Sequence, residues 1–197
     1  MHRRSNADGV APRAVSLRSA KDSEARTLYA LIAANLEEGH LLPRTLSELT
    51  AHATRFVVAT RGRRIVGCAE LAALSPHVAE VRSLAVNGRE RGKGVGTMIV
   101  DELRRRARGE GFEKLCAFTH APAYFIQMGF SIVPHTWLLE KLTTDCVKCP
   151  LFRACGQYAM VVPLDCAQGR PFDNAQGRAA ESVYGVDRAP AAVARYA

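Results

Sequence analysis

Three glycines occupy alternate positions in the segment VNGRERGKGVGTMIV, residues 86–100. Glycine at this density costs conformational entropy, so it marks a backbone that bends sharply or lets another molecule come close. Apolar runs on both sides predict a strand before the glycines and a helix after them. Free amides at the start of a helix, with the positive end of the helix dipole, favour phosphate groups. The first chemistry that this sequence indicates is therefore phosphate or pyrophosphate binding.

Two common phosphate-binding motifs do not fit this segment. A Walker loop has four residues between its first glycine and its Gly-Lys pair, whereas three residues separate Gly88 from Gly92. A dinucleotide fingerprint would have its third glycine at position 97, which is Thr97. The pattern that fits is R-x-x-G-x-G over residues 91–96. A glycine-rich turn without a ligand is the alternative.

A second group with chemical potential is the set Cys146, Cys149 and Cys155, spaced C-x2-C-x5-C. In a chain without a secretion signal, thiols at this spacing favour metal or redox chemistry over disulfides. Zinc takes such ligands, with His135 or Cys166 as a fourth. The sequence therefore leaves two interpretations open, a structural zinc ion or reduced thiols without a metal.

Composition places these groups in an ordinary soluble domain. The 197 residues are 48% hydrophobic and 23% charged, which is typical of globular proteins. No apolar run has the ~20 residues needed to cross a bilayer, and the first residues have no signal-peptide segment, so we expect a cytoplasmic protein without membrane contact. The formal charge is +8, but the basic residues are scattered with few aromatics between them, which argues against nucleic-acid binding.

The periodicity of apolar residues predicts the elements that position these groups. Strands are expected at 14–20, 55–60, 64–74, 80–86, 114–120, from 130 onward and at 158–164, and helices at 21–38, after Thr45, at 94–109 and at 121–128. This order predicts an α/β (α+β) fold, a mixed sheet with helices on both faces. We expect a flexible N-terminus over 1–12, one domain over 13–166, and a disordered low-complexity tail over 167–197, where AQGR occurs twice.

The glycine motif, between a strand and a helix, resembles the acyl-CoA-binding motif of the GNAT acetyltransferases. YFIQMGF, residues 124–130, is similar to the family's later segment of an aromatic residue, three variable residues and Gly-Phe. The resemblance covers about residues 13–164 and implies the GNAT fold, with a mostly antiparallel central sheet and acetyl-CoA as cosubstrate. It also implies two sets of acetyl-CoA contacts. The loop set is Arg91, Gly92, Lys93, Gly94, Val95 and Gly96, and the strand set, where the strand separates from its neighbour, is Leu84, Ala85 and Val86.

Acetyl transfer to an amine also requires a proton acceptor, because an α-amine with a pKa of ~8 is largely protonated at neutral pH. Glu80 matches the position where several GNAT enzymes have a glutamate base, although it could equally pair with Arg82, two residues along the same strand. Many members protonate the departing thiolate with a tyrosine at the position of Phe125. Phenylalanine cannot donate a proton, so the expected acid is Tyr124, with His120 or water as alternatives.

Phenylalanine at that position also resembles the N-acetylglutamate synthase branch of the family, which opens arginine biosynthesis. The segment LEEGHLLPRTLSELTAH, residues 36–52, is similar to the part of that branch whose basic residue contacts the carboxylates of glutamate. By resemblance this residue is Arg44, with Arg82 or Arg153 as a second donor. The chain has no kinase-like domain and therefore resembles the short, stand-alone synthases.

The sequence thus predicts acetyl transfer from acetyl-CoA to the α-amine of L-glutamate. A GNAT enzyme for another small amine or a protein N-terminus is one alternative. A metal- or nucleic-acid-binding module without catalysis is an alternative of another class. The oligomeric state is not determined by the sequence, and a homodimer is compatible with it.

Overall fold

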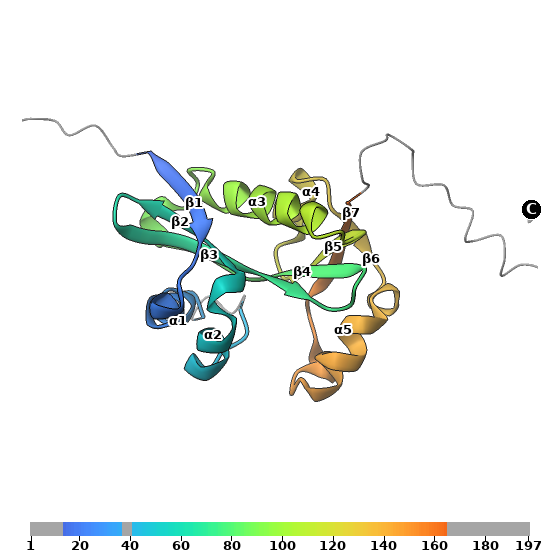
Figure 1. The fold of residues 1–197 in the computed structure, drawn as a ribbon. Helices are drawn as coiled ribbons and strands as arrows, with labels where there is room; N and C mark the ends of the chain where they lie inside the picture. The colour runs from blue at the N-terminus through green and yellow to red at the C-terminus, as the bar shows by residue number, and fades with distance from the viewer. Residues whose placement is uncertain (1–13, 37–40, 165–197) are drawn as a thin grey trace, which may run out of the picture. The chain divides into compact units, whose positions relative to one another are not determined.

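A seven-stranded sheet organises the computed structural model, which describes residues 14–36 and 41–164 (Figure 1). The strands are β1 (Val15–Ser19), β2 (Phe56–Arg61), β3 (Arg64–Ala73), β4 (Val78–Val86), β5 (Lys114–Thr119), β6 (Ser131–Val133) and β7 (Tyr158–Pro163). Their order across the sheet is β1-β2-β3-β4-β5-β7-β6, and among these neighbours β4 and β5 alone run parallel. The mixed, mostly antiparallel sheet is therefore confirmed. The expected ends, 1–12 and 167–197, lie outside the described residues.

Helices cover both faces of this sheet, as the sequence predicts (Figure 1). Helices α1 (Ala25–Ala33), α2 (Leu46–His52) and α5 (Leu139–Thr144) lie on one face, and α3 (Val95–Gly109) and α4 (Pro122–Gln127) lie on the other. Alternate residues of β2 belong to two cores: Val57 packs in the core that includes α3, and Phe56 in the core that includes α1 and α2. Successive strand residues point to opposite faces, so a strand covered on both sides is apolar throughout.

Local sequence patterns account for the start of α2 and the packing of α3. Thr45 caps α2: its hydroxyl accepts a hydrogen bond from the Glu48 amide, and the Glu48 carboxylate accepts one from the Thr45 amide. The stripe of α3 at every fourth residue, from Val95 through Ile99 and Leu103 to Ala107, is fully buried.

The strand expected from residue 130 onward is wrong beyond Val133. Pro134 has no amide to donate to a ladder, and β6 ends just before it. The apolar residues that follow form a 3-10 turn (His135–Trp137) and then α5. Leu138 is buried in a small core with β5 and β7, whereas Trp137 is exposed. The helix expected over 21–38 is also shorter, because it begins as a 3-10 turn (Asp22–Glu24) and its α-helical part ends at Ala33.

Strand β4 separates from β5 in the middle of the sheet, as the resemblance implies. The two strands are paired through three residues of β4, Val78 to Glu80, and diverge beyond them. On its other side β4 carries a bulge, because Ala85 lies opposite Cys68 but Arg82 lies opposite Glu70. Ser83 lies in this bulge with a φ of 55°, a left-handed conformation that is uncommon for a residue other than glycine. The bulge and the opening together distort β4 next to Glu80.

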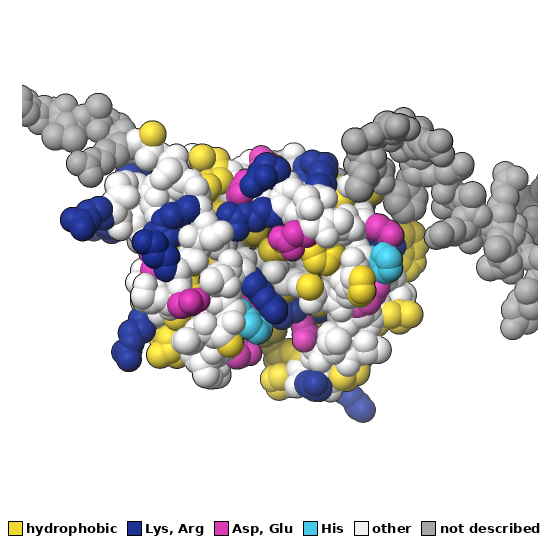
Figure 2. Space-filling view, viewed as in Figure 1, with side chains coloured by type: hydrophobic (Ala, Val, Ile, Leu, Met, Phe, Trp, Pro, Cys, Tyr) yellow, Lys and Arg dark blue, Asp and Glu magenta, His cyan; other side chains and the backbone are white. Residues whose placement is uncertain are grey.

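Charged side chains are distributed over the visible surface. Figure 2 shows lysine and arginine side chains at separate places, with acidic side chains between them. Within residues 14–36 and 41–164, no helix is both long and apolar enough to cross a membrane.

Candidate active site

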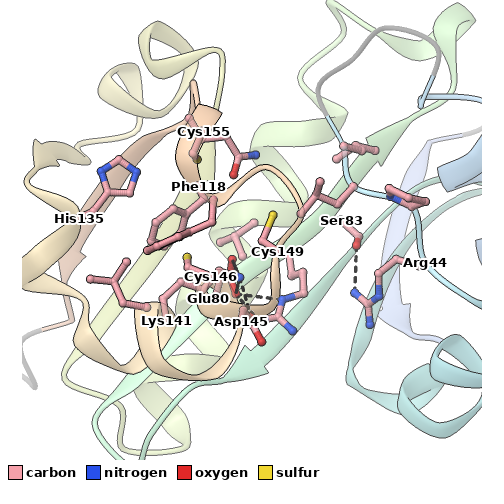
Figure 3. A pocket seen from close by; sticks show the side chains of 18 of the residues that line it. Arg44, Glu80, Ser83, Phe118, His135, Lys141, Asp145, Cys146, Cys149 and Cys155 are labelled. Carbon is pink, nitrogen blue, oxygen red and sulfur yellow. Dashed lines mark hydrogen bonds and ion pairs between the residues drawn. The ribbon is translucent and has the colours of Figure 1, made fainter.

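A cavity of about 590 Å³ opens where β4 and β5 diverge (Figure 3). Residues 80–83 of β4 and Phe118 of β5 form its base. Residues 41–44, which precede α2, form one wall, and α5 with the segment that follows it forms another. The lining is apolar over much of its area but contains several charged side chains, an arrangement typical of small-molecule sites.

The carboxylate of Glu80 lies at the base of this cavity, with 4% of its side chain exposed. Arg82 donates to Oε2 from Nε at 2.9 Å and from Nη2 at 2.5 Å. Lys141 of α5 lies with Nζ 2.8 Å from Oε1, and 5.4 Å from the centre of the Phe118 ring. Both cations therefore hold a buried carboxylate, which compensates for its removal from water.

Asp145 completes this cluster from the end of α5. Its Oδ2 lies 2.5 Å from Arg82 Nη2 and 2.8 Å from Lys141 Nζ, so two carboxylates and two cations alternate in a closed ring. Burial acts to raise the pKa of Asp145, but the hydrogen bond from Lys141 and the charges of both cations outweigh it, and the pKa lies below its ordinary value. Burial would lower the pKa of Arg82, yet the charges of Glu80 and Asp145 raise it above the ordinary value.

Arg44 provides a separate cationic centre in the cavity. Its Nη1 donates to Glu70 Oε2 at 2.9 Å and to Ser83 Oγ at 3.2 Å. Glu70 is fully buried, and 9% of the Arg44 side chain is exposed. Figure 3 shows Arg44 and Ser83 to one side of the cavity, and Lys141 with Asp145 to the other. The unusual backbone of Ser83 thus places a hydroxyl against Arg44.

The glycine loop leads directly into α3. Gly94 has a φ of 77° and precedes the first residue of the helix, where a side chain would strain the backbone. Arg91 is anchored by hydrogen bonds from Nη2 to Asn35 Oδ1 at 2.5 Å and from Nε to the Val86 carbonyl at 3.2 Å. Gly96 has a different constraint, because a Cβ atom there would lie 2.6 Å from the hydroxyl of Tyr124. The first turn of α3 has backbone amides without intrahelical partners, as at any helix N-terminus, and such termini favour anions.

Comparison with known proteins identifies the family to which these features belong. The model of the Acetyltransferase (GNAT) family matches residues 22–130, which is more than half of the 197 residues. The chain belongs to the GNAT family. It is an acetyl-CoA-dependent acyltransferase, related to proteins named amino-acid acetyltransferases.

Individual relatives of this GNAT protein differ in length. An uncharacterized N-acetyltransferase of Chlorobaculum tepidum is 29% identical over 75% of this chain and 96% of its own length. The amino-acid acetyltransferase of Neisseria meningitidis is 29% identical over 66% of this chain, which spans 30% of that enzyme. The N-acetylglutamate synthase of Neisseria gonorrhoeae, solved with coenzyme A and N-acetyl-glutamate, superposes with a TM-score of 0.70 at 25% identity. That superposition covers 77% of this chain and 35% of the synthase.

The structure brings together some of the expected site residues and not others. Glu80, Arg82 and Arg44 all line the cavity. Arg153 is exposed on a 3-10 turn (Phe152–Ala154) and is not part of the cavity lining. Tyr124 lies away from that lining, against the start of α3, where burial raises its pKa above the ordinary value. Its role as the acid stays a prediction.

The acetyl-CoA residues that the resemblance implies lie on consecutive elements. Leu84, Ala85 and Val86 form the end of β4 beyond its separation from β5. The loop set of residues 91–96 follows within a few residues and ends in the first turn of α3. A single short 3-10 turn (Gly88–Glu90) therefore separates the end of β4 from the loop that leads into α3.

The cysteine group lies in the wall of the cavity. Cys146, Cys149 and Cys155 are free thiols, the first two half-buried and the third exposed. Burial is the main cause that raises the pKa of Cys146. Among the described residues no three His, Cys, Asp or Glu side chains are placed to hold a metal ion. The zinc interpretation therefore has no support in that part of the chain, and Cys166 lies outside the described residues.

Sequence analysis missed Glu70, Lys141 and Asp145. Glu70 is the sole acidic residue in the apolar run RIVGCAELAAL, and a charge in a buried strand requires a partner. Lys141 and Asp145 are four residues apart, a spacing that places both on one face of a helix. Since α5 was expected to be a strand, that spacing carried no information.

Proposed function

We propose that this acetyltransferase transfers the acetyl group of acetyl-CoA to the α-amine of L-glutamate. The supporting observation is that three cationic side chains line one cavity around a buried carboxylate: Arg44 at one side, and Arg82 with Lys141 at the other. Glutamate offers two carboxylates to two cationic centres and one ammonium to Glu80. The relative that was solved with N-acetyl-glutamate, named above, supports the same acceptor.

The opened strand pair would bring the two substrates together. The first turn of α3 and residues 91–96 would hold the pyrophosphate of acetyl-CoA, as backbone amides at a helix terminus do. Leu84, Ala85 and Val86 would carry the pantetheine arm toward the cavity base. Glu80 would take the ammonium proton, directly or through a water molecule, after exchanging one of its cation contacts. The free amine would then attack the thioester carbonyl, and Tyr124 is the proposed donor to the thiolate.

Replacing Arg44 by alanine tests the acceptor assignment. The change removes a charge-assisted contact of roughly 1.5–3 kcal/mol, which corresponds to an increase of about 10- to 100-fold in the KM for glutamate. The KM for acetyl-CoA should stay nearly unchanged, because binding to one substrate alone is lost. Arg44→Lys should recover the affinity in part, since lysine keeps the charge without the planar fork.

The matched control is Arg63→Ala, which removes an exposed arginine from the turn between β2 and β3. It should leave both KM values unchanged. Thermal unfolding must be measured in parallel, because Arg44→Ala also removes the guanidinium group that lies 2.9 Å from the buried carboxylate of Glu70. Equal increases in both KM values, or none, would contradict the assignment of Arg44 to the acceptor.

A further inference from the structure

The carboxylate of Asp145 occupies the cationic centre that the proposed function assigns to the acceptor. One oxygen atom, Oδ2, lies 2.5 Å from Arg82 Nη2 and 2.8 Å from Lys141 Nζ. A carboxylate of the acceptor, bound at this centre, would make the same two contacts. Acceptor binding and the Asp145 contacts are therefore mutually exclusive at these atoms.

Of the two carboxylates that contact Arg82 and Lys141, Asp145 is the one more able to leave. Glu80 belongs to the central strand β4, and its side chain is 4% exposed. Asp145 follows the last residue of α5, a helix of six residues, and 39% of its side chain is exposed. Water can therefore solvate it when its contacts break, which lowers the cost of the exchange.

The charges of the ring support the same exchange. Arg82 and Lys141 are balanced by Glu80 and Asp145, so these four groups have no net charge. Without Asp145 the ring would carry one positive charge. A carboxylate of the acceptor, bound at Arg82 and Lys141, would restore the balance.

We infer that Asp145 is an intramolecular competitor for the acceptor's carboxylate, and this rests on the proposed function for the identity of that acceptor. The acceptor binds by replacing Asp145 at Arg82 and Lys141. An amine without a carboxylate cannot replace these contacts and leaves the ring closed. Asp145 therefore lowers the affinity for acceptors that place a carboxylate at Arg82 and Lys141, and it does not compete with an amine that has no carboxylate.

Binding of glutarate, a dicarboxylate without an amine, tests this inference apart from catalysis. Isothermal titration of glutarate into the full chain, saturated with coenzyme A, is compared between the wild type and Asp145→Asn. Removing one competing charged contact should tighten glutarate binding about tenfold. Asp145→Ala should act in the same direction, whereas Asp145→Glu keeps the carboxylate and should bind glutarate like the wild type.

The matched control is Glu140→Gln, which removes one negative charge from the same helix at a residue outside the cavity lining. Its glutarate affinity should equal that of the wild type. Coenzyme A affinity serves as the measure of folding for each variant. The inference would be overturned if Asp145→Asn and Asp145→Ala both bind glutarate no more tightly than the wild type. It would also be overturned if none of the proteins binds glutarate detectably.

The two proposals fail in different ways. If the wild type does not acetylate glutamate but Asp145→Asn still tightens glutarate, the proposed acceptor is wrong and the competition stands. If the wild type acetylates glutamate while neither variant changes glutarate or glutamate affinity, the acceptor stands and the competition is refuted.

Discussion

The substitution Glu80→Gln tests the proposed proton-accepting role of this carboxylate. Glutamine preserves the shape of the side chain but removes its charge and presents an amide N–H group toward two cations. Lys141 and Arg82 lose the partner that lies 2.8 Å and 2.5 Å from them, respectively. Asp145 continues to contact both, at 2.8 Å and 2.5 Å. The variant should therefore fold, with a measurable loss of stability.

The loss of stability can be bounded from these contacts. Removing one partner of a fully buried ion pair costs roughly 3–5 kcal/mol. Here Lys141 and Arg82 are 13% and 25% exposed and keep Asp145 as a partner, so about 1–2 kcal/mol is expected after that discount. For a chain of this length each kcal/mol lowers Tm by about 2–4 °C. Differential scanning calorimetry should therefore record a decrease of about 2–8 °C.

The kinetic effect should be much larger and depend on pH. Without a general base, kcat at neutral pH should fall by roughly 10²–10⁴. The rate of the variant should then rise about tenfold per pH unit, because the fraction of unprotonated acceptor rises by that factor below the amine's own pKa. The assay is release of coenzyme A from acetyl-CoA at saturating glutamate across the pH range, with Glu140→Gln as the control. A variant with near-normal kcat at every pH would refute Glu80 as the base. So would a variant whose kcat is reduced by the same factor at every pH and which has also lost affinity for acetyl-CoA.

Two further predictions concern the loop and the cysteines. Gly96→Ala places a Cβ atom 2.6 Å from the Tyr124 hydroxyl, so it should lower the free energy of unfolding by about 1–3 kcal/mol and weaken acetyl-CoA binding. In a double-mutant cycle, Tyr124→Phe should relieve most of this loss of stability. An equal loss with tyrosine and with phenylalanine at position 124 would exclude the contact as its cause. In alkylation followed by peptide mapping, the exposed Cys155 should react in the native protein. Buried Cys68 and Cys116 should react only after the protein is unfolded, because burial raises the pKa of both thiols, that of Cys68 to about 12. Protection of native Cys155 that chelation removes would indicate a bound metal instead.

Local patterns in the sequence predict most of the sheet and the position of the glycine loop before α3. The apolar stripe of α3, the cap at Thr45 and the glycines before Val95 each depend on neighbours in sequence, and each has the expected place in the structure. The separation of β4 from β5 came from the resemblance, because pairing between distant strands has no local pattern.

The inner contacts of the cavity depend on tertiary structure and could not be predicted in the same way. Arg44 was expected to face a substrate and does line the cavity, but its contact from Nη1 to Glu70, 26 residues away, was not expected. Lys141 reaches Glu80 across 61 residues. The strand expected from residue 130 concealed α5, and with it the spacing that brings Lys141 and Asp145 together. Charged residues whose partners lie far away in the sequence can be recognised as one site only in the folded structure.

The acceptor is tested most directly by identifying the acetylated product. The full chain is incubated with acetyl-CoA and an equimolar mixture of L-glutamate, L-aspartate, L-glutamine, L-lysine and a peptide with a free N-terminus, and the products are identified by mass spectrometry. The proposed function predicts N-acetyl-L-glutamate as the main product, formed with coenzyme A in equal amount. Acetylated lysine or peptide with unmodified glutamate would contradict it.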